Sequence, residues 1–169
     1  MAKPYFLVRA TFLLALLALC LPARAQQFQP EIKAYLQSVK PDWNLTDDDI
    51  SDWTVSDQYA NRKTGVTYTY LHQQISGIRI YNAVSTMAIR NGKVEYFANR
   101  FYPDAAHKAN TTHPSLPPET AIQLAAAQLG VALGQAPQLQ SKDENRHRMT
   151  FNDCGISDHP VQVELLFVP

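Results

Sequence analysis

The spacing of hydrophobic residues changes along the chain and marks its elements. From residue 29 to residue 40 the apolar side chains recur every three or four positions, which predicts an amphipathic helix. Pro41 predicts the end of this helix, because proline has no amide donor and disfavours helix in the residue before it. The apolar positions on which the helix depends are Phe28, Ile32, Tyr35, Leu36 and Val39.

A short acidic segment follows. Thr46 precedes three aspartates, Asp47, Asp48 and Asp49, and this order predicts an N-cap with negative charge against the helix dipole at a single turn. A calcium-binding loop does not fit, because the alternating aspartates, central glycine and closing glutamate of such a loop are missing.

The period becomes two at Trp53, where Trp53, Val55, Asp57 and Tyr59 alternate with polar residues. This alternation predicts a first strand, and β-branched and aromatic residues predict three more over residues 66–75, 78–89 and 93–102. Ser76-Gly77 and Asn91-Gly92 are typical of tight hairpin turns. We therefore expect an antiparallel meander with the N-terminal helix across one face.

The remainder of the chain predicts a second, smaller unit. Residues 103–118 contain several prolines and polar residues and predict a linker. A helix then opens at Pro117-Pro118-Glu119, with an apolar stripe that ends near Gly130 or Gly134. Strands are expected at residues 148–151 and 161–168. We expect the chain to be a fragment or a truncated precursor, since an apolar strand with an unpaired edge is a poor end for a soluble protein. The predicted stripe consists of Ala121, Ile122, Leu124, Ala125 and Leu129.

Residues 1–25 predict a signal peptide. Lys3 and Arg9 precede an apolar run over residues 10–21, and an A-x-A site places cleavage between Ala25 and Gln26. The run is too short for a comfortable membrane span. A lipoprotein signal at Cys20 is disfavoured, because the preceding residue would normally be small. We expect export to the periplasm or medium, without stable membrane association after cleavage.

Charge and chemistry exclude several function classes. The precursor has 15 basic and 15 acidic residues, and removing the signal peptide leaves 12 basic against 15 acidic, without the clustered Lys and Arg of a nucleic-acid footprint. Cys154 would be the only cysteine left, so no internal disulfide is expected. The sequence has no H-E-x-x-H, G-x-S-x-G elbow, phosphate loop or dinucleotide fingerprint. We expect no catalytic, metal or cofactor site in this chain. The histidines are scattered, at positions 72, 107, 113, 147 and 159.

An ordered set of residues along the predicted hairpins resembles the fungalysin/thermolysin propeptide (FTP) motif of secreted zinc metalloprotease precursors, in its fungalysin branch. Family members often have histidine where this chain has Tyr68. The helix and strands after the motif resemble a partial PepSY-like or cystatin-like subdomain. The residues that carry the resemblance, and that we take as candidates for motif or docking roles, are Thr64, Gly65, Val66, Tyr68, Tyr70, Gln73, Gly77, Ile78, Asn82, Asn91 and Gly92.

The resemblance implies an α+β fold, with a propeptide domain at residues 26–103, a linker at 104–116 and a truncated subdomain at 117–169. It also implies a non-catalytic pro-region that helps a catalytic domain to fold and inhibits it, with zinc only in that domain. Docking would use the exposed face of the 66–75 and 78–89 hairpin, or an open sheet edge. A stand-alone module that inhibits proteases in trans is the alternative.

Overall fold

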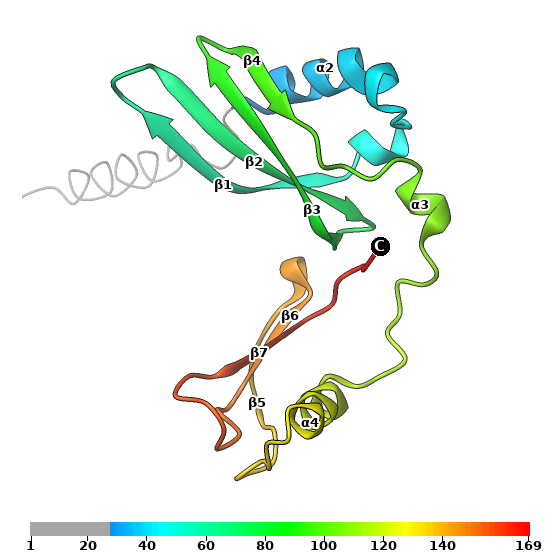
Figure 1. The fold of residues 1–169 in the computed structure, drawn as a ribbon, viewed down its shortest axis with the longest axis vertical. Coiled ribbons are helices and arrows are strands. Elements are labelled where there is room, and N and C mark those ends of the chain that lie inside the picture. Colours follow the sequence, from blue (N-terminus) through cyan, green and yellow to red (C-terminus); the bar gives the residue numbers. More distant parts are fainter. Residues whose placement is uncertain (1–27) are drawn as a thin grey trace, which may run out of the picture.

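The computed structural model describes residues 28–169. The predicted signal peptide, with its cleavage site, lies outside the described residues. The fold consists of a four-stranded antiparallel sheet with helix α2 and a smaller three-stranded antiparallel sheet with helix α4 (Figure 1). This confirms the predicted α+β class. The elements in chain order are α2 (Gln29–Val39), η2 (Lys40–Trp43), η3 (Asp48–Ile50), β1 (Trp53–Asn61), β2 (Val66–Ile75), β3 (Ile78–Arg90), β4 (Lys93–Ala98), α3 (Ala105–Lys108), α4 (Pro118–Gln128), β5 (Leu139–Asp143), η4 (Glu144–Arg146), β6 (Arg148–Phe151) and β7 (Val161–Glu164).

The first sheet is the predicted meander, with strand order β1-β2-β3-β4. Ser76 and Gly77 both have positive φ, and so do Asn91 and Gly92. Two consecutive residues with positive φ make the turn whose twist matches that of antiparallel strands. The two predicted hairpin turns are therefore present.

Helix α2 covers one face of this sheet and forms the main core with it (Figure 1). Ile32 and Leu36 of the helix are fully buried, as are Leu71 of β2 and Met87 of β3. Tyr35 and Trp43 both make edge-on contacts with Phe97 of β4. The buried face of α2 is thus the face that the helical spacing of apolar residues predicts.

Strand β1 departs from the simple alternation that we expected. Val55 pairs with Leu71 but Asp57 pairs with Tyr70, so Ser56 forms a β-bulge. Because a bulge adds one residue to its strand, the side chains beyond it change faces. Val55 packs against the main core, whereas Tyr59 is exposed. The prediction that these two residues share a face was wrong.

Strand β4 ends at Ala98 instead of the predicted residue 102. The chain beyond it is held by side chains of the inner strands. The Ser85 hydroxyl accepts a hydrogen bond from the Arg100 amide at 2.8 Å. The Gln73 side chain bonds both the amide and the carbonyl of Tyr102, at 2.8 and 3.0 Å. These side-chain bonds take the place of a regular ladder.

The segment predicted as a linker contains the short helix α3, which is tied to the first unit by Asp49. The buried Asp49 carboxylate accepts hydrogen bonds from the amides of Asp104 and Ala105 at 2.7 and 2.9 Å. It also bonds Thr46 reciprocally. The N-cap was predicted at Thr46, but the 3-10 helix η3 begins at Asp48 and its N-cap is Asp47. Burial by itself would raise the pKa of Asp49, but the hydrogen bonds from Thr46, Ala105 and Asp104 outweigh it and leave the pKa lowered.

The second unit has strand order β5-β6-β7 and a small core around Phe151, Ile122 and Cys154. The predicted strand at residues 148–151 is present, but β5 was not predicted and β7 ends at Glu164. Only part of the apolar stripe of α4 is buried: Ile122 is 5% exposed, whereas Leu124 is 54% exposed. No helix within residues 28–169 has the length and apolar character needed to cross a membrane.

Candidate docking surface

Most of the small or polar candidate motif residues determine the path of the backbone at turns and bulges. Thr64 and Gly65 lie exposed in the loop between β1 and β2, where the Asn61 side chain accepts a hydrogen bond from the Thr64 amide. Positive φ favours glycine and asparagine because they suffer the smallest steric penalty in this region. The candidate residues with positive φ are Gly65, Gly77, Asn82, Asn91 and Gly92.

Asn82 has a separate role from the hairpin turns. Along β3 the pairing passes from Arg79 opposite Gln74 to Val84 opposite His72, so β3 contains extra residues at this point. Asn82, at φ 61°, lies within this irregular stretch. Its left-handed backbone lets β3 rejoin the ladder after the bulge. The motif asparagine is therefore explained by the path of the strand.

Three further candidates are buried. Val66 and Ile78 are 5% and 3% exposed, and Gln73 is fully buried. The Gln73 amide nitrogen donates to the carbonyl oxygens of Asp49 and Tyr102. These contacts join β2 to the segments before β1 and after β4. Gln73 thus uses its hydrogen-bonding groups inside the domain, with none left at the surface for a partner.

The exposed side chains of the motif region form a row of tyrosines across the sheet face opposite helix α2. Tyr59 of β1 is opposite Tyr68 of β2, Tyr68 is opposite Ala88 of β3, and Ala88 is opposite Tyr96 of β4. The exposed fractions of Tyr59, Tyr68 and Tyr96 are 60%, 37% and 61%. We call these three residues the tyrosine row. Tyrosine offers a large apolar ring and a hydroxyl at its tip, which suits a protein interface.

Polar side chains also lie on this face. Tyr70, half-buried, is the neighbour of Asp57 across the β1–β2 pair. His72 lies further along β2, and its Nε2 is 3.1 Å from the Ile80 carbonyl oxygen. Burial, and then the positive charge of Arg79, lower the pKa of His72, so its ring is neutral at pH 7.

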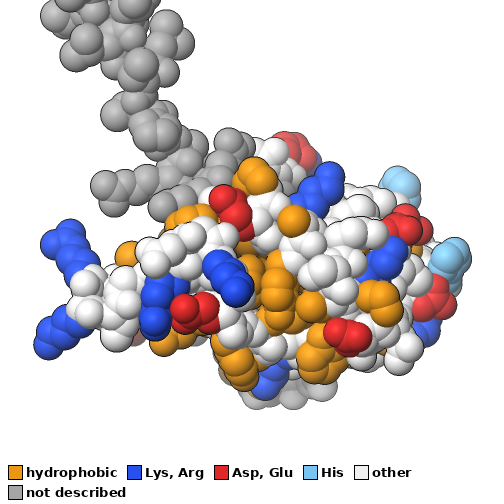
Figure 2. Space-filling model, turned by 90° about the horizontal axis from the view of Figure 1, so that it is seen from above, with side chains coloured by type: hydrophobic (Ala, Val, Ile, Leu, Met, Phe, Trp, Pro, Cys, Tyr) orange, Lys and Arg blue, Asp and Glu red, His pale blue; other side chains and the backbone are white. Residues whose placement is uncertain are grey.

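Charged side chains on the described surface are mixed in sign. Figure 2 shows acidic and basic groups interspersed around a hydrophobic area, with basic side chains projecting at one end. No continuous basic band of the kind that binds a phosphate backbone is visible on this face. The view agrees with the balanced charge of the sequence.

Within residues 28–169, no three His, Cys, Asp or Glu side chains lie close enough together to hold a metal ion. Cys154 is fully buried in the second core, and burial followed by the charge of Asp153 raises the pKa of its thiol. A buried thiol with a raised pKa is a poor nucleophile, because the thiolate is the reactive form.

Two members of the tyrosine row, Tyr59 and Tyr96, are not among the candidate residues predicted from the sequence. The signal that would have found Tyr96 was present, since the Asn91-Gly92 turn fixes the approximate pairing of β3 with β4. Tyr59 was harder to find, because the bulge at Ser56 reverses the face that simple alternation assigns to it.

A comparison with known protein families matches part of the chain. The family described as the Fungalysin/Thermolysin Propeptide Motif matches residues 51–101, the part of the chain from just before β1 to just after β4. No curated protein matches the chain. The matched segment includes the whole four-stranded sheet and all three residues of the tyrosine row. Residues 51–101 thus match the fungalysin/thermolysin propeptide motif, which is a non-catalytic part of the precursors of such metalloproteases.

Proposed function

We propose that this chain is the pro-region of a secreted fungalysin-type zinc metalloprotease, and that it helps the catalytic domain to fold and holds it inactive. The match of residues 51–101 to the propeptide motif carries this proposal. A pro-region that is covalently joined to its enzyme acts at high effective concentration until cleavage separates the two. Zinc would be bound by the catalytic domain, which supplies the chemistry.

We further propose that the tyrosine row is the docking surface for the catalytic domain. Eight of the eleven candidate residues from the sequence have a role in a turn, a bulge or the interior, which leaves Thr64, Tyr68 and Tyr70. Of these, only Tyr68 combines a large side chain with more than a third of its surface exposed. With Tyr59 and Tyr96 it forms a row of exposed aromatic side chains, interrupted by Ala88, across the four strands. Such anchors dominate the free energy of protein binding.

A domain division accompanies this proposal. Residues 26–103 would form the propeptide domain, and residues 117–169 a subdomain similar to PepSY domains. Because α3 is bonded to Asp49 of the first unit, the connection between the two units would consist of residues 109–117.

The experiment adds residues 26–169 to the purified catalytic domain of a fungalysin-type protease and measures binding and proteolysis. The wild-type chain should bind and inhibit. Replacing Tyr59, Tyr68 and Tyr96 together with serine should weaken inhibition by about tenfold or more, because buried tyrosines are common hot spots. Tyr81→Ser is the matched control, since Tyr81 is 51% exposed but lies outside the row.

Two results would contradict the proposal at different levels. No binding of any fungalysin-type catalytic domain by the wild-type chain would exclude the pro-region function. Inhibition that is equally strong in the triple variant and the wild type would leave that function in place but exclude the tyrosine row as its docking surface.

A further inference from the structure

The two units meet through a group of three ionic side chains. Arg79 projects from β3 of the first unit, and Arg148 and Glu164 come from β6 and β7 of the second. One carboxylate oxygen of Glu164 accepts a hydrogen bond from Arg79, and the other accepts one from Arg148 at 3.0 Å. The side chains of Arg79 and Glu164 are only 20% and 17% exposed. Glu164 therefore bridges the two units from a largely buried position.

Positive charge exceeds negative charge at this contact. Burial, followed by the charges of Arg148 and Arg146, lowers the pKa of Arg79, although an arginine remains charged at any ordinary pH. In residues 28–169, Glu164 is the one carboxylate that pairs with Arg79, and the Arg79 Nε is buried without a partner. Without the negative charge of Glu164, two neighbouring guanidinium groups would face each other with no counter-ion. Removing one partner of a buried ion pair is strongly destabilising for this reason.

The backbone contacts beside Glu164 are few. Phe167 forms a single parallel β-bridge with Ile80: its amide donates to the Arg79 carbonyl at 2.9 Å, and its carbonyl accepts from the Tyr81 amide at 2.7 Å. The Phe167 ring packs against Ile80, Ala83 and Ala105, a much smaller group than the main core. Two hydrogen bonds and one ring hold the chain after β7 on the edge of β3.

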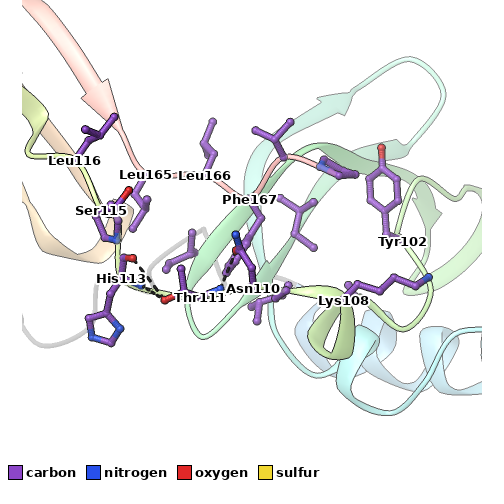
Figure 3. A pocket seen from close by; sticks show the side chains of 18 residues that line it. Tyr102, Lys108, Asn110, Thr111, His113, Ser115, Leu116, Leu165, Leu166 and Phe167 are labelled. Carbon is purple, nitrogen blue, oxygen red and sulfur yellow. Dashed lines mark hydrogen bonds between the residues drawn. The ribbon is translucent and has the colours of Figure 1, made fainter. Parts of the chain in front are cut away.

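The segment that joins α3 to α4 is held by few side-chain hydrogen bonds. Hydrogen bonds of the Asn110 and Thr111 side chains stay within residues 110–113. Between this connection and the chain after β7 lies a cleft of about 740 Å³ (Figure 3). Figure 3 shows His113 and Leu116 on the connection and Leu165 and Phe167 on the opposite segment. The sheet edge lines the cleft with Ile75, Ile78 and Ile80.

We propose that Glu164 is an electrostatic latch that closes the second unit onto the edge of β3. With the latch intact, Phe167 covers part of the Ile75–Ile78–Ile80 strip. When the charge of Glu164 is lost, the Phe167 bridge opens, the second unit turns about residues 109–117, and this strip becomes exposed to solvent. The latch concerns how the two units are held together, and it does not depend on the proposed pro-region function.

Hydrogen exchange followed residue by residue tests the latch. In Glu164→Gln, exchange of the Tyr81 and Phe167 amides should accelerate by about tenfold or more relative to wild type, because Arg79 and Arg148 lose the carboxylate that they share among the described residues. The amides of Leu71 and Met149, inside the two sheets, should keep their wild-type rates. Glu144→Gln is the matched control, since Glu144 is 75% exposed and pairs with Lys142 in its own hairpin. It should leave all four amides unchanged.

A charge-swapped variant separates the latch from a general loss of folding. Arg79→Glu combined with Glu164→Arg restores one carboxylate between two guanidinium groups, and exchange at Tyr81 and Phe167 should return to within about threefold of wild type. The latch would be wrong if Glu164→Gln left these two amides at wild-type rates, if Met149 accelerated equally, or if the swapped variant gave no recovery.

Discussion

The hydrophobic core beside the four-stranded sheet is much larger than the core beside the three-stranded sheet. The four-stranded sheet and its helices bury eight hydrophobic residues in one cluster with six partly buried neighbours, whereas the three-stranded sheet buries three residues with four such neighbours. The first unit also has internal polar bonds through Gln73 and Asp49. Small units with little buried surface are marginally stable on their own. The comparison indicates that the second unit is the less stable of the two.

The largest expected effect is on the second core. Phe151 is fully buried there among Ile122, Met149 and Val163. Phe151→Ala should cost about 3–5 kcal/mol, which is the usual range for removing a buried ring. Because this core is small, the whole second unit should unfold while the first remains intact. Hydrogen exchange would then show fast amides in β5 to β7 and wild-type protection in β2 and β3. Loss of protection in both sheets at once would show that the two units unfold together, and would contradict the predicted difference in their stability.

The reciprocal change is in the main core. Leu71 is fully buried between the sheet and helix α2. Leu71→Ala should lower the free energy of unfolding by about 2–5 kcal/mol. Because the second unit has a core of its own, protection should fall in the first sheet and stay at the wild-type level in the second. Chemical denaturation and hydrogen exchange measure the two effects, and Leu129→Ala, at a side chain 78% exposed, serves as control. Loss of protection in the second sheet as well would show that the stability of the second unit depends on the first.

Acid should weaken the first unit through Asp49. The pKa of Asp49 is below its ordinary value of 3.8. Its charged form therefore stabilises the fold above about pH 4, and this stabilisation disappears as the pH falls through the lowered folded-state pKa. Asp49→Asn should cost about 1.5–3 kcal/mol at pH 7, the range for hydrogen bonds to a charged group. The difference between variant and wild type should shrink by pH 2.

Urea denaturation at several pH values checks this prediction. Asp48→Asn is the control, because Asp48 is exposed and has no comparable set of amide donors. A loss of stability in Asp49→Asn that is the same at pH 7 and pH 2 would show that the carboxylate charge has no part in holding α3 to the first unit.

The smallest expected effect concerns the turn that lies beside the second unit. Gly77 has φ +78°, and the His147 side chain of the second unit lies next to it. Gly77→Ala should cost about 1–2 kcal/mol, the strain of a side chain in the left-handed region. Gly65→Ala, with φ +67° and open space around it, should cost a similar amount. Thermal unfolding of the two variants gives the comparison. A much larger loss for Gly77→Ala would mean that the contact with His147 adds to the backbone strain.

The meander was predictable from sequence because its signals are local. Asn91-Gly92 and Ser76-Gly77 specify turns of two residues, and period-two alternation identifies the strands between them. Helix α2 was predictable for the same reason, since Ile32 and Leu36 repeat with the helical period. These features need no information from distant parts of the chain.

The features that were missed depend on contacts between distant residues. Strand β4 ends early because Gln73, 29 residues before Tyr102, bonds the backbone there. No glycine, proline or asparagine next to Ser56 indicates a bulge in the sequence. The alternation of residues along β1 therefore did not predict that Tyr59 is exposed. Strand β5 is exposed along its whole length and lacks an apolar pattern. Identifying the candidate docking surface requires the register of four strands. The pattern of hydrophobic residues along a single strand does not give this register.

The most direct test of the proposed docking surface is hydroxyl-radical footprinting of residues 26–169 with and without a fungalysin-type catalytic domain. We expect the catalytic domain to protect Tyr59, Tyr68 and Tyr96 from modification. Tyr81 and Tyr102, which are exposed outside the row, should react as in the free chain. Unchanged modification of the row in a complex that is inhibited and stable would contradict the account, and so would protection confined to Tyr81 and Tyr102.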